Sequence, residues 1–171
     1  MSELLLKLFV PKGSPDDPEV RSRCGLLSGL TGIILNILLV AGKLTVGLIA
    51  GSVAIIADAV NNFSDAASSV ITLIGFKLAG QKPDKEHPFG HGRIEYIAGL
   101  IVSVLIIFMG FELAWSSIEK IITPEPAAFS YAAMGVLIAA ILVKVWLFYF
   151  NRKISKRINS ASIAATATDS L

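Results

Sequence analysis

Four long apolar stretches dominate the sequence, and they span about residues 24–50, 52–78, 94–117 and 131–150. A helix that crosses a lipid bilayer needs about 20 mainly apolar residues, because hydrocarbon offers no hydrogen-bond partners to unpaired backbone groups. All four stretches meet this length. A fifth stretch of small residues, SASIAATATDSL, begins after Asn159 and runs to the last residue. The sequence therefore predicts an all-α, polytopic membrane helix bundle with four transmembrane helices and the start of a fifth.

The composition supports a membrane protein and excludes other classes. Hydrophobic residues make up 54% of the chain and charged residues 16%, whereas soluble domains carry roughly 25% charged residues. The net charge of +2 is too small to indicate a nucleic-acid partner, and the single Cys24 cannot form an internal disulfide. Because Lys7 interrupts the first apolar run and Pro11 follows it, a cleaved signal peptide is not expected. We expect residues 1–23 to be an amphipathic cytoplasmic segment, followed by one membrane domain over residues 24–171.

The basic residues predict the orientation of the chain in the membrane. Most of the 15 lysines and arginines lie before the first apolar stretch, between the second and the third, or after the fourth. Loops rich in lysine and arginine normally stay in the cytoplasm. We therefore expect the N-terminus and the loops at 79–93 and 151–158 to be cytoplasmic, in a multi-pass protein of the cell membrane.

The second apolar stretch contains polar residues that hydrocarbon does not tolerate. Its segment ADAVNNFSDAASS places four of them inside the expected span, namely Asp58, Asn61, Asn62 and Asp65. An ionisable group at that depth costs at least ~2.5 kcal/mol on insertion scales, so such residues usually face a bundle interior or a water-filled path. At 100° per residue the four share one helix face, which predicts a polar seam. Hydrogen bonding between helices is the alternative, and it explains the asparagines but not two carboxylates.

The seam contains half of a metal site. Asn61 and Asp65 lie four residues apart, so one helix presents both side-chain oxygens to a single cation, with Asp58 on the same seam. The other ligands must come from another helix. The obvious candidate is the fifth stretch, where Asp169 follows small residues that allow close helix packing. A partner ligand four positions further on would fall beyond Leu171, so we expect the chain to be incomplete.

Three other charged residues within the spans receive a structural interpretation. We expect Lys43 to extend toward the membrane surface, with an ion pair to a carboxylate of the seam as the alternative. Glu112 and Lys144 are expected to pair with one another or to reach an interface, and neither is assigned a functional role.

The loop at 81–93, QKPDKEHPFGHGR, holds both histidines of the protein. Its proline and glycine residues make a helix implausible, so turns must bring its side chains together. Asp84, His87 and His91 could then form a surface metal site with mixed oxygen and nitrogen ligands, which would suit zinc or a similar first-row ion. The spacing alone equally allows a solvated turn with incidental histidines.

Two blocks of the chain resemble the cation diffusion facilitator family of metal efflux transporters. GSVAIIADAVNNFSDAASS resembles the second-helix block of that family, and PDKEHPFGHGRIE is similar to its signature loop between the second and third helices. The resemblance covers about residues 24–171. It implies a six-helix cation efflux fold, of which this chain holds a truncated N-terminal part. It also implies a homodimer that exchanges a divalent metal for protons, and not an enzyme.

The resemblance also assigns residues to metal sites. Family members pair two residues of the second helix with two of the fifth, which here implies Asn61 and Asp65 together with Asp169. The aspartate and two histidines of the 81–93 loop match a second family metal site. No separate cofactor is implied, since the divalent metal is the substrate.

The ligand types indicate which metal is carried. Zinc-type members usually have histidine in the ligand pair of the second or fifth helix, whereas Asn61, Asp65 and Asp169 all offer oxygen. Oxygen ligands favour manganese or ferrous iron over zinc, so manganese is favoured, with iron and zinc as alternatives. The rival hypothesis is a non-transporting membrane scaffold that binds metal or dimerises, and its support is the incomplete chain.

Overall fold

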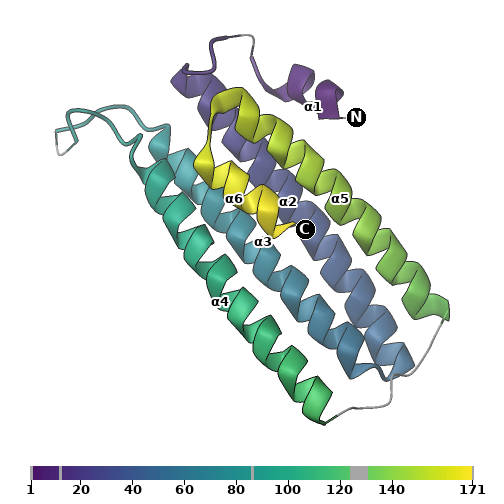
Figure 1. Cartoon of the computed structure of the whole chain (residues 1–171). Coiled ribbons are helices and arrows are strands. Elements are labelled where there is room, and N and C mark those ends of the chain that lie inside the picture. The colour runs from purple at the N-terminus through teal and green to yellow at the C-terminus, as the bar shows by residue number, and fades with distance from the viewer. Residues whose placement is uncertain (1, 12, 86, 124–130, 171) are drawn as a thin grey trace.

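The computed structural model describes residues 2–11, 13–85, 87–123 and 131–170, and these residues form helices and no strands. The helices are α1 (Ser2–Phe9), α2 (Pro18–Ala50), α3 (Val53–Ala79), α4 (Ile94–Ile122), α5 (Tyr131–Ile158) and α6 (Ala161–Asp169). Helices α2 to α5 lie side by side in an elongated bundle, and the short α6 lies in its middle, with the C-terminus about halfway along (Figure 1). The prediction of an all-α membrane helix bundle is confirmed.

The ends of helix α2 are set by capping residues and not by the limits of the apolar stretch. Helix α2 starts where the Asp17 side chain accepts a hydrogen bond from the backbone N–H of Glu19 at 2.9 Å, with Pro18 in the first turn. It ends at Gly51, whose φ of 60° is a left-handed conformation that favours glycine. The predicted spans were therefore too short for α2, α4 and α5, because the apolar run marks only the part that lies in hydrocarbon.

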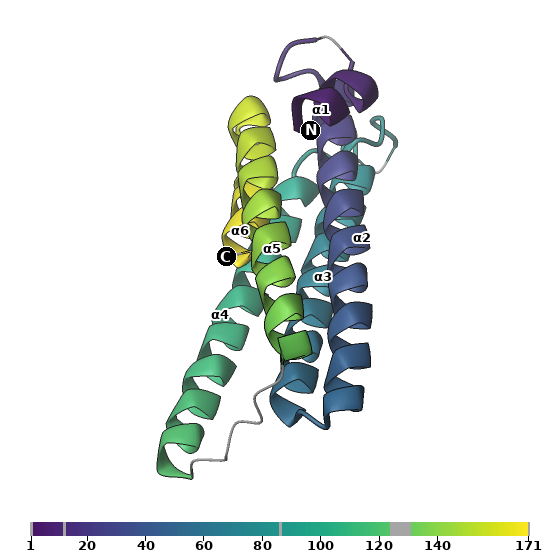
Figure 2. The ribbon, with the colours of Figure 1, turned by 90° about the vertical axis from the view of Figure 1, so that its right-hand side faces the viewer.

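Three of the described helices are both long and apolar enough to cross a membrane, and they are Pro18–Ala50, Ile94–Ile122 and Met134–Ile158. Helix α3 is 27 residues long, which is also enough for a crossing, but its polar seam lowers its hydropathy. It lies between α2 and α4 in the bundle (Figures 1 and 2). The polar helix thus has an apolar helix on either side, an arrangement that turns its polar face toward the bundle.

Small residues let α2 and α3 approach closely. A Cβ atom placed on Gly25 would lie 2.0 Å from the Phe76 ring, and one on Gly29 would lie 2.6 Å from the Leu73 Cβ. Close contact through small residues is the usual way in which helices associate in membranes, where apolar burial alone gives no driving force. This contact holds the seam of α3 in a fixed position relative to α2.

One end of the bundle is closed by an apolar cluster and an ion pair. The cluster joins α1, α2, α3, α5 and α6, and it consists of Leu6, Val10, Val20, Cys24, Phe76, Leu147, Phe150, Ile154, Ile158 and Ile163. The expected amphipathic N-terminal segment therefore contains a helix whose apolar face packs onto this end. Beside the cluster, Arg21 Nη2 donates to both carboxylate oxygens of Glu95 at 2.8 and 2.9 Å. Its Nη1 donates to the backbone oxygen of Ile158.

Candidate functional site

The polar face of α3 points into the bundle, as the periodicity predicts. Asp65 is 4% exposed, Asn62 is 1% exposed, and Ser69 and Thr72 are buried further along the same face. Asn61 is partly buried. The buried Nδ2 of Asn62 has no hydrogen-bond partner among the described residues. The structure therefore gives this face an ionic and polar interior that packing alone does not require.

Asp65 forms an ion pair with Lys144 of α5, whose Nζ donates to Asp65 Oδ2. Of the two alternatives expected for Lys144 and Glu112, pairing with one another or reaching an interface, the pairing was therefore wrong. Asp65 is the deeper carboxylate and has the greater need of a cation, whereas the Glu112 side chain is exposed on α4. The sequence does not favour Asp65 over Glu112 as the partner of Lys144, because nothing in it says which helix faces α5.

Asp58 forms a second ion pair, with Lys43 of α2 at 2.7 Å. Lys43 is only 3% exposed, so the expected extension toward the membrane surface was wrong and the alternative of pairing with the seam holds. The two aspartates of α3 are thus each matched by one lysine, and these lysines come from different neighbouring helices.

A cavity of about 250 Å³ brings the seam and the fifth stretch together. Its polar lining consists of Lys43, Asp58, Asn61, Asn62, Lys144, Asp169 and Ser170. Helix α6 reaches this position because it packs against α4 and α5 and touches α3, where Thr72 and Thr166 share a hydrogen bond of 2.9 Å. Asp169 therefore lies on the same cavity as Asn61, and Lys144 links that cavity to Asp65.

The donors around this cavity suit a hard divalent cation. Carboxylate and amide oxygens are the ligands that manganese and similar ions prefer, and three aspartates supply negative charge beside two lysines. Asp58 and Asn61 also line a second cavity of about 250 Å³ on the α4 side, together with Glu112 and Lys120. Asn61 thus stands between two polar spaces, which is a position suited to a ligand on a path.

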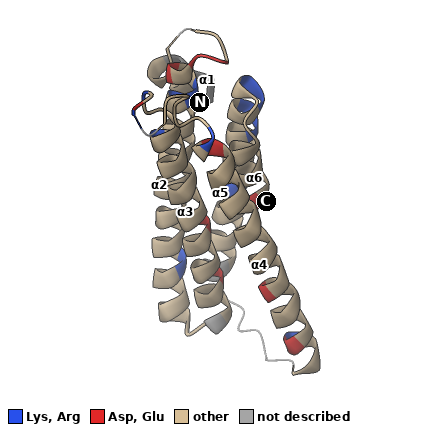
Figure 3. Cartoon of the chain, turned by 90° about the vertical axis from the view of Figure 1, so that its left-hand side faces the viewer, with Lys and Arg blue, Asp and Glu red and all other residues tan. Residues whose placement is uncertain are grey.

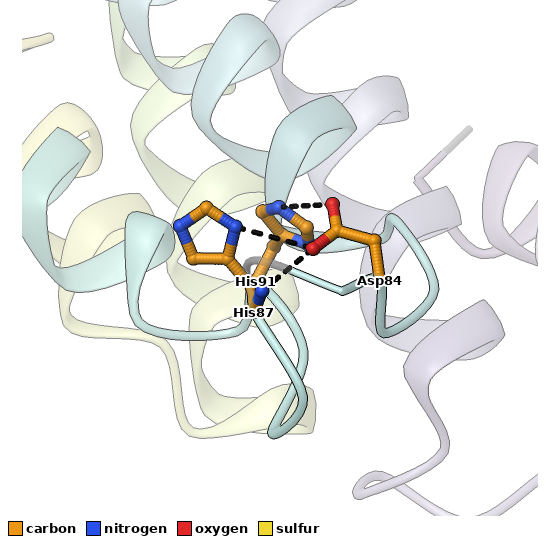
Figure 4. Close-up of side chains that lie close together, drawn as sticks. All are labelled: Asp84, His87 and His91. Atoms are coloured by element: carbon orange, nitrogen blue, oxygen red, sulfur yellow. Dashed lines mark hydrogen bonds and ion pairs between the residues drawn. The ribbon is translucent and has the colours of Figure 1, made fainter.

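The loop between α3 and α4 gathers the second predicted set of ligands. One ligand atom from each of Asp84, His87 and His91 lies within 4.8 Å of the others (Figure 4). Asp84 Oδ1 lies 3.4 Å from His87 Nδ1, and Asp84 Oδ2 lies 3.6 Å from His91 Nε2. The backbone N–H of His87 also donates to Asp84 Oδ1 at 2.6 Å. The loop therefore brings the three predicted ligands together, with Asp84 and His87 on the solvent-exposed side.

His91 is the buried member of this loop cluster. Only 9% of its side chain is exposed, and its Nδ1 has no hydrogen-bond partner among the described residues. The loop turns at Gly90, whose φ of 79° lies in the region that favours glycine. One carboxylate with two imidazoles fits a first-row metal ion, and the cluster needs no helix to bring its ligands together.

The Arg21 to Glu95 ion pair was not predicted. Glu95 lies in the same PDKEHPFGHGRIE block as the loop histidines, but its partner is 74 positions away. The only signal in the sequence was a charged residue just inside the third apolar stretch, and that signal does not name a partner. This contact fixes the start of α4, and with it the loop that carries His91.

Taken together, the spanning helices, the ionic seam and the histidine loop define a polytopic membrane protein with charged groups in its interior. The model of the cation efflux transmembrane domain matches residues 30–171, so the chain belongs to the cation efflux family. The chain is 31% identical over 138 residues to a transporter of Methanocaldococcus jannaschii, covering 81% of this chain and 49% of that protein.

Two further relatives carry names that mention metals. The manganese efflux system protein MneS of Bacillus subtilis is 33% identical over 150 residues, which cover 85% of this chain and 50% of that protein. Mitochondrial metal transporter 1 of Saccharomyces cerevisiae is 28% identical over 172 residues, which cover 87% of this chain and 34% of that protein. The chain thus spans about half the length, or less, of the relatives it matches.

Proposed function

We propose that this chain forms the metal-binding part of a transporter that exports a divalent cation across the cell membrane in exchange for protons. The observation that carries the proposal is the buried Asp65, whose ion-pair partner Lys144 lines one polar cavity inside the bundle together with Asn61 and Asp169. A buried carboxylate among spanning helices has a high energetic cost, so it indicates an ion path.

The ligand roles follow from this arrangement. Asn61, Asp65 and Asp169 bind the metal, and Asp58 adds negative charge beside them. The metal reaches this site from the cytoplasm and leaves on the other side when the helices rearrange around it, as in alternating access. Because carboxylates bind metal in their deprotonated form, metal binding releases protons and metal release takes them up.

Manganese is the proposed substrate, with iron and zinc as alternatives. The support is the donor set, which is oxygen at all three ligand positions of the seam. A relative named as a manganese efflux protein is also 33% identical over 85% of this chain. The loop cluster of Asp84, His87 and His91 is proposed as a second, cytoplasmic metal site.

The orientation and assembly are part of the same proposal. Lysines and arginines gather at the end of the bundle where α2 begins and α5 ends, and few lie along the helices (Figure 3). By the positive-inside rule this end, with the N-terminus and the histidine loop, faces the cytoplasm. The family resemblance supports a homodimer as the working unit.

The first prediction tests the seam through Asp65→Asn. Asparagine keeps the size and one oxygen but loses the charge that offsets a dehydrated divalent ion, so manganese uptake into inverted vesicles should fall at least ~100-fold, since several kcal/mol of charge stabilisation are lost. The native full-length protein should be used, and the variant should remain monodisperse on size exclusion.

The matched control is Asp16→Asn, which makes the same change at an exposed residue before α2. Its transport should equal that of the wild type. If Asp65→Asn transports manganese normally, the seam is packing and the proposed path is wrong.

A further inference from the structure

The two ion pairs of the seam are built in opposite ways. In the Lys43 to Asp58 pair the lysine is the buried partner, with 4% of its side chain exposed, against 38% for the aspartate. In the Lys144 to Asp65 pair the aspartate is buried at 5%, while the lysine side chain keeps 18% exposure. Lys43 is therefore enclosed in the interior, and Lys144 is the lysine with room to move.

The cavity beside Lys144 gives its ammonium group a place to go. This cavity, of about 250 Å³, is lined by Lys144, by the proposed ligands Asn61 and Asp169, and by polar residues outside the ligand set, namely Asp58, Asn62 and Ser170. A lysine ammonium sits on a flexible four-carbon stem, so it can leave one carboxylate without any movement of its helix. The ammonium can therefore move from Asp65 into a polar space and does not have to enter hydrocarbon.

Metal and ammonium cannot share Asp65. An unpaired carboxylate buried at this depth would be strongly destabilising, so Asp65 must be accompanied by a cation whenever it is deprotonated. A divalent ion held by Asp65 and Asn61 would repel an ammonium group bonded to the same carboxylate, and the repulsion is strong where the dielectric constant is low. The two cations are therefore alternatives at one site.

We propose that the Lys144 ammonium is a tethered cation that neutralises Asp65 in the metal-free protein and is displaced by the transported metal. Lys144 thereby sets the affinity of the site, since each binding event must break its ion pair. The return of the ammonium also helps the metal to leave. This inference rests on the proposed function, because it takes Asp65 to be a metal ligand.

The test measures manganese binding to the native full-length protein in lipid nanodiscs, by the electron paramagnetic resonance signal of free Mn²⁺. Lys144→Met removes the competing charge and keeps an unbranched side chain, so binding should tighten at least ~10-fold. Lys144→Arg keeps the charge and should bind close to the wild-type value. The control is Lys156→Met, at an exposed lysine of the same helix, and it should change nothing.

Transport by the same variants separates competition from structural support. In inverted vesicles Lys144→Met should lower both KM and kcat, because the metal binds more tightly and leaves more slowly. A lysine that only supports the fold would raise KM or lower kcat alone. Unchanged or weaker manganese binding in a monodisperse Lys144→Met protein would overturn the inference.

A measurement on the wild-type protein keeps the inference testable if Lys144→Met does not fold. Manganese should raise the rate at which an amine-specific reagent modifies Lys144, as read by mass spectrometry, and an unchanged rate overturns the inference.

The proposed function and the further inference predict different results when they fail. If the proposed function is wrong, Asp65→Asn binds manganese like the wild type; if only the inference is wrong, Asp65→Asn is defective and Lys144→Met binds like the wild type.

Discussion

At the scale of single residues, the proposed metal site depends on the polar face of α3. Asp58 and Asp65 are each neutralised by a lysine from a different helix, and Asn61 lies between two polar cavities without a charge of its own. In the proposed site, Asn61 contributes a neutral oxygen ligand, so replacing it changes the type of donor atom without changing the charge. Residue 61 is therefore the position at which the proposed metal preference is most directly tested.

The second prediction concerns Asn61→His. Imidazole nitrogen favours zinc relative to manganese, so the ratio of zinc to manganese uptake into vesicles should rise about tenfold. Asn61→Gln, which keeps an amide oxygen, should leave the ratio near its wild-type value. An unchanged ratio in Asn61→His would mean that residue 61 does not contact the metal.

At the level of helices, the contact of α2 with α3 decides where the seam lies. Gly29 of α2 lies against Leu73 and against the backbone oxygen of Ser69, which belongs to the polar face of α3. Gly42 of the same helix has no atom within 4 Å of the position of a Cβ. Substituting alanine at each of the two glycines therefore distinguishes the effect of close helix packing from the effect of helix propensity.

The third prediction compares Gly29→Ala with Gly42→Ala. The first adds a methyl group 2.6 Å from the Leu73 Cβ, and overpacking of this kind costs roughly 1–3 kcal/mol of unfolding free energy. The second should be neutral or slightly stabilising, because alanine is the better helix former. Unfolding in mild detergent micelles measures both. Equal stability of the two variants would show that α2 and α3 do not approach as closely as described.

At the scale of the whole molecule, one arginine ties together three helices at the end that carries the histidine loop. Arg21 of α2 holds Glu95 at the start of α4 and the backbone oxygen of Ile158 at the end of α5. These residues are far apart in sequence, and the contact closes the bundle next to the apolar cluster. We expect this end to depend on the ion pair for its stability.

The fourth prediction is that Glu95→Gln lowers the free energy of unfolding by roughly 1–3 kcal/mol, because a partly buried guanidinium loses its charged partner. Thermal unfolding in detergent at fixed ionic strength measures the loss. The control is Glu119→Gln, at an exposed position of the same helix, which should be neutral. If Glu95→Gln leaves the free energy of unfolding unchanged, the apolar cluster alone stabilises this end of the bundle.

The sequence by itself determined which segments form the long helices, which face of α3 is polar and which residues are candidate metal ligands. Hydrocarbon demands about 20 apolar residues per crossing, and 100° per residue places Asp58, Asn61 and Asp65 on one face, so both results follow from local spacing. The loop cluster was predictable for the same reason, since its ligands lie within eight positions of one another.

Only the tertiary structure decided which charges meet. Lys144 could have faced Glu112 or Asp65, and Lys43 could have reached the membrane surface, because spacing along one helix does not say how neighbouring helices are rotated. Packing of α5 against the bundle settled the partner of Lys144, and packing of α2 against α3 settled that of Lys43. Packing of α6 placed Asp169 on the cavity of the seam. The physical reason is that a buried carboxylate pairs with the nearest cation, and the distance between two side chains on different helices depends on how those helices pack.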